Sequence, residues 1–248
     1  MKKELVLGFD MQTQPDEVTC GPTCLQALYN YYGDTMPLED VIREVRSLKL
    51  GGTLAVMLGH HALQRGYKAH IYTYNLNVFD PTWFKSSSKK MIQHLQAQME
   101  FKHKRRKLLA ASEAYISFLE EGGELRNDEL DESLIIDYLK KSVPILTGLS
   151  ATYLYDSARE IPQFDIYDSI KGEPAGHFVV ITGYDEDKGR AYISDPMESN
   201  PLGKGGHVYS VSFRRLINSI LLGIVTYDAN LLVIEPKEKK KNAKTNNS

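Results

Sequence analysis

The chain changes character along its length, from helically spaced apolar residues to strand-like runs. Up to residue 66 apolar positions recur three and four residues apart, and beyond residue 143 they alternate or form continuous runs. A helical first part followed by an antiparallel β part is typical of an α+β fold. The pattern predicts a strand at 3–10, helices at 19–33, 38–48 and 54–65, a strand at 67–74, two or three helices within 80–142 with the last at about 131–141, strands at 143–149, 177–183, 190–195 and near 207–211, a helix at 212–220 and a strand at 222–234.

The first predicted helix has recognisable ends and begins at a cysteine. Thr19 is placed to cap it, Pro22 suits its first turn and Gly33 suits its exit. Cys20 would then lie where the helix dipole and free backbone N–H groups stabilise a thiolate. Gln14 lies six residues upstream, and a side-chain amide there can help to bind the oxyanion that forms when a thiolate attacks a carbonyl. The arrangement indicates a thiol-dependent hydrolase, which also needs a base.

Seven histidines are candidates for that base, and His177 is distinguished by its position. It begins an apolar strand, and Asp195 ends the partner strand of the same predicted hairpin 18 residues later. In a tight antiparallel hairpin the start of one strand lies beside the end of the other. We therefore expect Asp195 to hold one ring nitrogen of His177 while the other nitrogen faces the Cys20 sulfur, as a thiolate–imidazolium pair.

Composition and charge narrow the class of protein. The chain has 248 residues, 42% of them hydrophobic and 25% charged, and its net charge of −2 gives no global field for nucleic acid or an anionic membrane. The first residues lack the features of a signal peptide, and no apolar run is long enough to predict a membrane span. The two cysteines lie four residues apart on one predicted helix, a poor spacing for a disulfide, so the reducing cytoplasm is the simplest compartment.

Taken together, these motifs resemble the bacteriocin-processing cysteine peptidase family. The resemblance extends over roughly residues 5–75 and 140–235. Members of that family cleave leader peptides after a double glycine, often as the N-terminal domain of an ABC exporter. The resemblance rests on Gln14, then five residues and Cys20-Gly21-Pro22, with a later Gly-His-Phe-Val-Val from Gly176 and Asp195-Pro196 after the next strand.

The resemblance implies a papain-like α+β fold, with the nucleophile helix packed on an antiparallel sheet. It implies Cys20 as the nucleophile, His177 as the base, Asp195 as the group that orients His177, and Gln14 as the oxyanion donor. The chain ends without a transporter, so a stand-alone member is expected. No cofactor and no metal are expected to take part.

We expect a single papain-like domain over residues 1–236. Residues 80–142 are predicted as a helical insertion in it, and the Lys/Asn-rich residues 237–248 as a disordered basic tail. The sequence does not identify the role of the insertion, the oligomeric state, or a partner transporter or peptide ligase that supplies the substrate.

The predicted function is a cysteine peptidase or amidase that acts on a peptide or peptide-like substrate through a Cys-His-Asp triad and an acyl-thioester intermediate. One alternative is an acyl or aminoacyl transferase, because an amine can capture the same intermediate in place of water. The other is a non-catalytic peptide-binding module on the same scaffold. Hydrolysis and transfer are not distinguished by the residues.

The other candidate residues have simpler interpretations. Cys24, one turn after Cys20, is expected to be a buried and inert thiol. His60 and His61 point to different faces of a helix and make a poor metal chelate. His207 follows a Gly-rich segment that suits a flexible rim of the active site. The basic run 103–107 is predicted as a solvated helix face. Aromatic residues before His177 could line a substrate groove or pack in the core: Tyr153, Tyr155, Phe164 and Tyr167.

Overall fold

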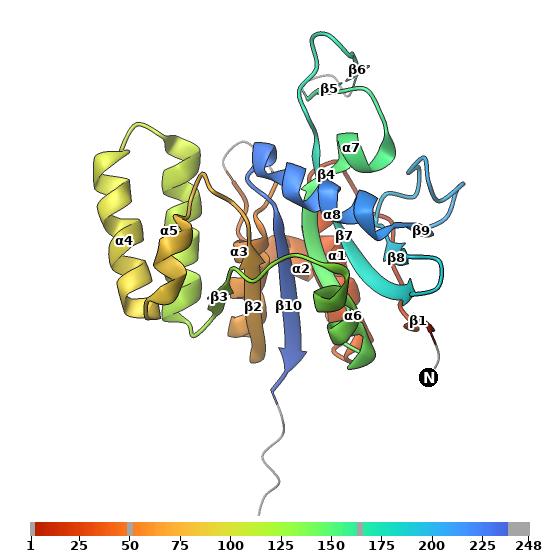
Figure 1. The fold of residues 1–248 in the computed structure, drawn as a ribbon, viewed down its shortest axis with the longest axis horizontal. Coiled ribbons are helices and arrows are strands. Elements are labelled where there is room, and N and C mark those ends of the chain that lie inside the picture. Colours follow the sequence, from red (N-terminus) through yellow and green to blue (C-terminus); the bar gives the residue numbers. More distant parts are fainter. Residues whose placement is uncertain (1–2, 49–51, 163–165, 238–248) are drawn as a thin grey trace, which may run out of the picture.

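A sheet runs through the molecule with helices on both of its faces (Figure 1). The computed structural model describes residues 3–48, 52–162 and 166–237. Phe164 and all but the first residue of the predicted basic tail lie outside the described residues. Up to residue 140 the elements are β1 (Glu4–Val6), α1 (Cys20–Tyr31), α2 (Leu38–Glu44), α3 (Ala55–Gln64), β2 (Tyr67–Thr73), the 3-10 helix η1 (Pro81–Lys85), α4 (Ser88–Phe101), α5 (Arg106–Glu120), β3 (Glu124–Arg126) and α6 (Glu132–Lys140).

The rest of the chain supplies most of the sheet. Its elements are β4 (Ile145–Ser150), α7 (Ala151–Tyr155), β5 (Glu160–Ile161), β6 (Ile166–Tyr167), β7 (Gly176–Asp185), β8 (Arg190–Ser194), β9 (Val208–Ser212), α8 (Phe213–Leu222), η2 (Gly223–Thr226) and β10 (Asn230–Pro236). The strand order is β3-β2-β10-β4-β7-β8-β9, with β1 on β7. Among these pairs, β2–β3 is parallel and the others are antiparallel. The short β5–β6 hairpin projects beyond α7 (Figure 1).

Both faces of the sheet are buried, because successive side chains of its central strands enter two different hydrophobic clusters. In β10, Leu232 and Ile234 join the cluster that contains α1, α3 and α5, whereas Leu231 and Val233 join the cluster that contains α6 and α8. Figure 1 shows α6 and α8 in front of the sheet and α1 to α3 behind it. The expected α+β architecture, with the helix that begins at Cys20 packed on the sheet, is confirmed.

The α5 helix belongs to the core of the α1 face. Leu108, Tyr115 and Phe118 are buried in the same cluster as α1. The Phe118 ring packs so closely on Gly123 that a Cβ there would stand 2.4 Å from it, and a Cβ on Gly59 of α3 would stand 2.9 Å from it. The contact between Phe118 and Gly59 joins the 80–142 segment to α3, and the close packing on both glycines leaves no room for a larger residue.

Three local predictions were wrong, each for an identifiable reason. The Thr19 side chain does not cap α1, because its hydroxyl bonds back to the Asp16 backbone. No strand was predicted within 80–142, but β3 forms there as a three-residue edge strand. The last strand begins at residue 230 and not at 222, because η2 follows α8 directly and Tyr227 and Ala229 have φ values of 75° and 64°.

A buried polar network joins β2, β3 and α6. Nε2 of His70 lies 2.7 Å from the Tyr138 hydroxyl, and Arg126 donates to the same hydroxyl at 3.2 Å. Burial, and then the charge of Arg126, lower the pKa of His70 to about 4. The folded protein therefore holds His70 neutral through the pH range where an unfolded chain would protonate it.

This network makes a prediction about acid stability. Because the folded-state pKa of His70 lies below the unfolded value of about 6.5, its contribution is complete above that pH and is lost as the pH falls toward 4. At about 1.4 kcal/mol per pH unit, the loss amounts to about 3 kcal/mol of unfolding free energy. Urea unfolding of the wild type and of His70→Gln between pH 7 and pH 4 measures it. Parallel pH profiles for the two proteins would contradict the prediction.

Candidate active site

Cys20 is the first residue of α1 and is mostly buried, with 9% of its surface exposed. The first N–H groups of a helix have no partner within that helix, so the sulfur lies beside unpaired backbone donors. The next residue brings this turn against the sheet. A Cβ on Gly21 would stand 2.6 Å from Cγ2 of Thr53 and 3.2 Å from the Phe178 ring. Glycine at this position lets the cysteine approach β7, where Phe178 follows His177.

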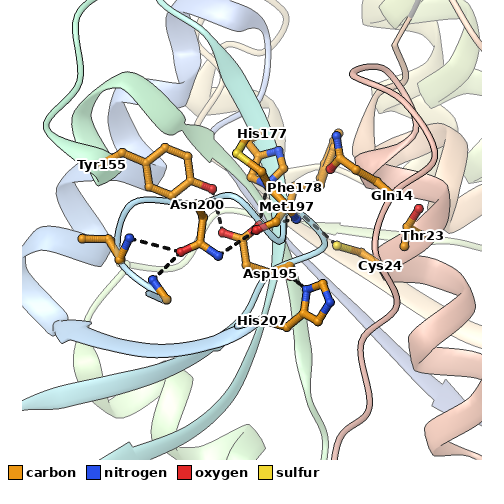
Figure 2. Close-up of polar contacts among 12 residues, drawn as sticks. Gln14, Thr23, Cys24, Tyr155, His177, Phe178, Asp195, Met197, Asn200 and His207 are labelled. Atoms are coloured by element: carbon orange, nitrogen blue, oxygen red, sulfur yellow. Dashed lines mark hydrogen bonds and ion pairs between the residues drawn. The ribbon is translucent and has the colours of Figure 1, made fainter. Parts of the chain in front are cut away.

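The β7–β8 hairpin brings His177 and Asp195 together. His177 is the second residue of β7, Asp195 follows the last residue of β8, and the two strands pair antiparallel with Val180 opposite Ser194. Nε2 of His177 donates to Oδ1 of Asp195 over 2.9 Å (Figure 2). His177 is 5% exposed and Asp195 is fully buried. The hairpin therefore places the carboxylate against the imidazole inside the protein.

Asp195 has a complete set of hydrogen bonds. Oδ1 accepts from His177 and, at 2.9 Å, from the backbone N–H of Met197. Oδ2 accepts from the hydroxyls of Tyr155 at 2.6 Å and Tyr209 at 2.7 Å. Burial alone would raise the pKa of Asp195, but the charge of His177 and these hydrogen bonds hold it below its usual range. The carboxylate is thus ionised and fixed in orientation.

The imidazole of His177 is held in its charged form. Burial alone would lower the pKa of His177, but Asp195 and then Cys20, each through charge and hydrogen bonding, raise it to about 10. Because Asp195 engages Nε2, Nδ1 is the nitrogen left for the cysteine. The geometry matches a cationic imidazole between a buried carboxylate and a sulfur.

Gln14 lies on the loop that leads into α1 and is half-buried. Its backbone N–H donates to the carbonyl of Pro196, which ties this loop to the turn after Asp195. Its side-chain Nε2 donates to the Asp16 carbonyl at 2.8 Å, and its Oε1 is buried without a partner. A carboxamide has two N–H donors, so one remains for another acceptor after Asp16 is satisfied. In the view of Figure 2, Gln14 lies on the α1 side of the site, as do Thr23 and Cys24.

Loss of the Gln14 amide tests its expected role as an oxyanion donor. We expect Gln14→Ala to lower turnover by about 10²–10³-fold, the effect typical of removing one such donor. The substitution should leave the alkylation rate of Cys20 nearly unchanged, because alkylation generates no oxyanion at a carbonyl. Rates of peptide cleavage and of iodoacetamide labelling, measured on the same preparation, separate the two effects. A turnover rate in the variant equal to that of the wild type would show that Gln14 is not an oxyanion donor.

His207 connects the two loops of the site. Nδ1 of His207 lies 2.7 Å from the Asp195 carbonyl oxygen, and Nε2 lies 3.3 Å from the Thr13 hydroxyl, next to Gln14. The Thr13 hydroxyl also donates to Glu198 at 3.1 Å. His207 therefore contacts both the loop that contains Thr13 and the turn that contains Asp195, at the rim of the site where the sequence predicts it.

The remaining candidates have structural surroundings. The Cys24 thiol is fully buried and lies 3.3 Å from the Phe178 carbonyl, and burial raises its pKa well above the usual value. It is therefore protonated and unsuited to nucleophilic attack. His61 is buried against Tyr29 and Glu44. In the described part of the chain no cluster of three or more His, Cys, Asp or Glu side chains is arranged to hold a metal ion.

Sequence reasoning missed the two tyrosines that hold Asp195. Tyr155 was assigned only to a groove or the core, and Tyr209 was not singled out. Each lies far from Asp195 in sequence, 40 and 14 residues away, on a different element. No motif marks a tyrosine as the partner of a buried carboxylate, although the need of such a carboxylate for donors is itself predictable.

Comparisons with known proteins found a matching family model and solved structures of similar fold. A family model described as the Peptidase_C39 like family matches residues 109–214, a range that contains His177 and Asp195 but not Cys20. No curated protein matches the sequence. A crystal structure of a protein from Bacillus anthracis, described as a C39-like peptidase, has a TM-score of 0.52 and 14% identity, covering 94% of this chain and 98% of that one. This likeness shows the fold.

Two further solved structures are similar. One is a double glycine motif protease from an AMS/PCAT transporter in complex with the leader peptide, with a TM-score of 0.44, 14% identity and 94% of each chain covered. The other is the peptidase domain of Streptococcus ComA, a bi-functional ABC transporter of a quorum sensing pathway, with a TM-score of 0.43, 15% identity, and 92% of this chain and 99% of that one covered. Among the helices in the described ranges, none is both long and apolar enough to span a membrane.

Proposed function

Starting from a chain with a C39-like peptidase fold and a match to that family over residues 109–214, we propose that it is a cysteine peptidase. The observation that carries the proposal is the buried His177–Asp195 pair, whose imidazole is poised toward the first residue of α1. Cys20 is the nucleophile, His177 the acid and base, and Asp195 the group that orients the imidazole.

Acylation follows from the protonation states of the pair. The Cys20 thiolate attacks the carbonyl carbon of a peptide bond, and the carbonyl oxygen takes the electron pair as an oxyanion. The Cys20 backbone N–H and the Gln14 side chain donate to that oxyanion. When the tetrahedral intermediate collapses, the C–N bond breaks and His177 gives its proton to the leaving amine. An acyl thioester on Cys20 and a neutral imidazole remain.

Deacylation runs the same groups in reverse. Neutral His177 takes a proton from water as the water attacks the thioester, and collapse of the second intermediate releases the acid and the Cys20 thiolate. An amine in the place of water would give acyl transfer with the same proton movements. Asp195 keeps the ring in one orientation through both halves, because its second oxygen is anchored by Tyr155 and Tyr209.

The substrate is a peptide, as the family resemblance implies. Both cysteines are free thiols, and the mechanism requires Cys20 to remain reduced. A reducing compartment such as the cytoplasm suits this chemistry.

Alkylation of the two cysteines tests the proposal with a control inside the same molecule. Iodoacetamide should label Cys20 rapidly, whereas Cys24 should stay unlabelled in the folded protein because burial raises the pKa of its thiol. Mass spectrometry of tryptic peptides after labelling from pH 5 to pH 9 gives both rates. Slow and equal labelling of the two cysteines would contradict a poised nucleophile.

Digestion of a peptide mixture then distinguishes hydrolysis from its alternatives. We expect new carboxyl termini from wild type and none from Cys20→Ala. Hydroxylamine added during the reaction would collect hydroxamates if acyl transfer to amines competes with water. If the wild type cleaves no peptide and the Cys20→Ala variant still binds peptides, the protein is a binding module.

A further inference from the structure

His207 lies in the candidate site but has no part in the proposed chemistry. It precedes β9, is half-buried and is bonded twice to Asp195. The backbone N–H of Asp195 donates to the His207 carbonyl at 2.9 Å, and Nδ1 of His207 lies 2.7 Å from the Asp195 carbonyl oxygen. A carbonyl oxygen only accepts, so Nδ1 carries a hydrogen and donates it. The imidazole is therefore fixed to the backbone of the residue that contacts His177.

The loop that precedes His207 is closed by a buried asparagine. Asn200 is 2% exposed, and its side-chain nitrogen donates to the carbonyls of Met197 and Gly206. Its side-chain oxygen accepts from two backbone N–H groups of the same loop (Figure 2). A Cβ on Gly203 would overlap the Gly206 carbonyl, so the two sides of the loop are in close contact. These bonds give His207 a defined place at the end of the loop.

The other ring nitrogen of His207 reaches the loop that carries the proposed oxyanion donor. Nε2 lies 3.3 Å from the hydroxyl of Thr13, which precedes Gln14. The backbone N–H of Gln14 itself donates to the Pro196 carbonyl at 3.0 Å. Residues 7–19, which join β1 to α1, form neither helix nor strand. Contacts such as these, and not a backbone ladder, therefore determine where Gln14 lies.

The contact between His207 and Thr13 does not depend on the charge of the ring. A neutral His207 with its hydrogen on Nδ1 accepts the hydroxyl hydrogen of Thr13 at Nε2. In a protonated ring Nε2 donates to the Thr13 oxygen, and the hydroxyl turns its hydrogen to Glu198, 3.1 Å away. The hydroxyl has a partner in either state, so the contact holds across the pH range in which histidines titrate.

The side-chain amide of Gln14 moves with its loop. Its Nε2 donates to the Asp16 carbonyl at 2.8 Å, so the side chain is bonded to a residue of the same loop. An oxyanion donor must lie within hydrogen-bond distance of the developing charge, and a displacement of about 1 Å can lower a rate by about 10²-fold. The contacts that hold this loop against the rest of the site therefore determine whether the amide is in place.

We propose that His207 is a positioning residue for the oxyanion donor, because through Thr13 it holds the loop that carries Gln14 in place. In this role His207 transfers no proton and touches no reacting atom. The two hydrogen bonds of its imidazole, one to Asp195 and one to Thr13, define the role. The inference rests on the proposed function, since it supposes that Gln14 donates to an oxyanion formed at Cys20.

Two amide variants separate the two hydrogen bonds of His207. The amide nitrogen of His207→Gln can take the place of Nε2 and keep Thr13, whereas that of His207→Asn can take the place of Nδ1 and keeps only Asp195. With a synthetic copy of the peptide that the wild type cleaves fastest in the digested mixture, we expect His207→Asn to lower kcat about tenfold at unchanged KM. His207→Gln should keep most of the activity. Iodoacetamide should label Cys20 equally in all three proteins, because labelling forms no oxyanion.

A double-mutant cycle tests whether His207 acts through Gln14. In Gln14→Ala no amide is left to position, so adding His207→Asn should lower kcat by less than about twofold. Thr13→Val, which removes the hydroxyl from the contact, should repeat the loss seen in His207→Asn. His60→Asn, on α3, replaces another half-buried histidine and is the matched control, which should keep wild-type kinetics. Thermal melting of each variant measures its folding.

Each outcome bears on the role of His207 or on the proposed function. A wild-type kcat in His207→Asn, or an equal loss when that substitution is added to Gln14→Ala, would overturn the role and leave the proposed function standing. If no His207 variant folds, Thr13→Val decides, because Thr13 is exposed, and an unchanged kcat there overturns the role as well. If the wild type cleaves no peptide, the proposed function fails, and the role of His207 fails with it.

Discussion

Replacing His177 with alanine is expected to lower peptide turnover by about 10⁴-fold or more and to abolish labelling of Cys20 at low pH. In the proposed mechanism, the imidazole supplies the proton to the leaving amine, accepts a proton from water, and carries the positive charge that stabilises the thiolate. Its pKa is raised to about 10 by Asp195 and Cys20, so at neutral pH the wild type holds that charge. Peptide cleavage and the pH profile of iodoacetamide labelling measure the two losses.

The control for this variant must separate chemistry from folding. Removal of His177 leaves Asp195 buried without its cationic partner, which commonly destabilises a protein by about 3–5 kcal/mol. His177→Gln keeps an N–H donor for the carboxylate, and His60→Ala removes a histidine that lies elsewhere, on α3. We expect His177→Gln to fold and to be inactive, and His60→Ala to be active. Selective low-pH labelling of Cys20 in folded His177→Gln would exclude a thiolate–imidazolium pair.

The sequence predicted the parts of the site that depend on local geometry. A helix start can be recognised from Pro22 and the apolar spacing beyond it, and this places Cys20 at an N-terminus. A tight hairpin brings the start of one strand to the end of the next, and this places His177 beside Asp195. Both inferences span short stretches of chain, where spacing determines the contact.

Contacts between distant segments were not predictable in the same way. Tyr155 and Tyr209 reach Asp195 from α7 and β9. These meetings depend on the order of strands in the sheet, which places β4, β7 and β8 side by side and β10 against β4. No spacing rule encodes that order, so the tyrosine donors of Asp195 emerge only from the folded chain.

The second large effect is expected from Asp195→Asn. We expect turnover to fall by about 10²–10⁴-fold, because the variant loses the charge that is the main cause of the raised pKa of His177. The pKa of His177 then falls, and the imidazole loses its proton at a lower pH than in the wild type. Without a cation beside the sulfur, we expect labelling of Cys20 by iodoacetamide to be slower than in the wild type at acidic pH.

The tyrosines determine how the asparagine side chain sits. Oδ2 of Asp195 accepts from both Tyr155 and Tyr209, whereas the backbone N–H of Met197 donates to Oδ1. Asparagine can keep its oxygen toward His177 and Met197 only by turning its NH₂ group to the two hydroxyls, which must then act as acceptors. We therefore expect Asp195→Asn to fold, with Tyr155→Phe as the matched single-bond control. An unshifted labelling profile in Asp195→Asn would show that the carboxylate orients the imidazole without setting its charge.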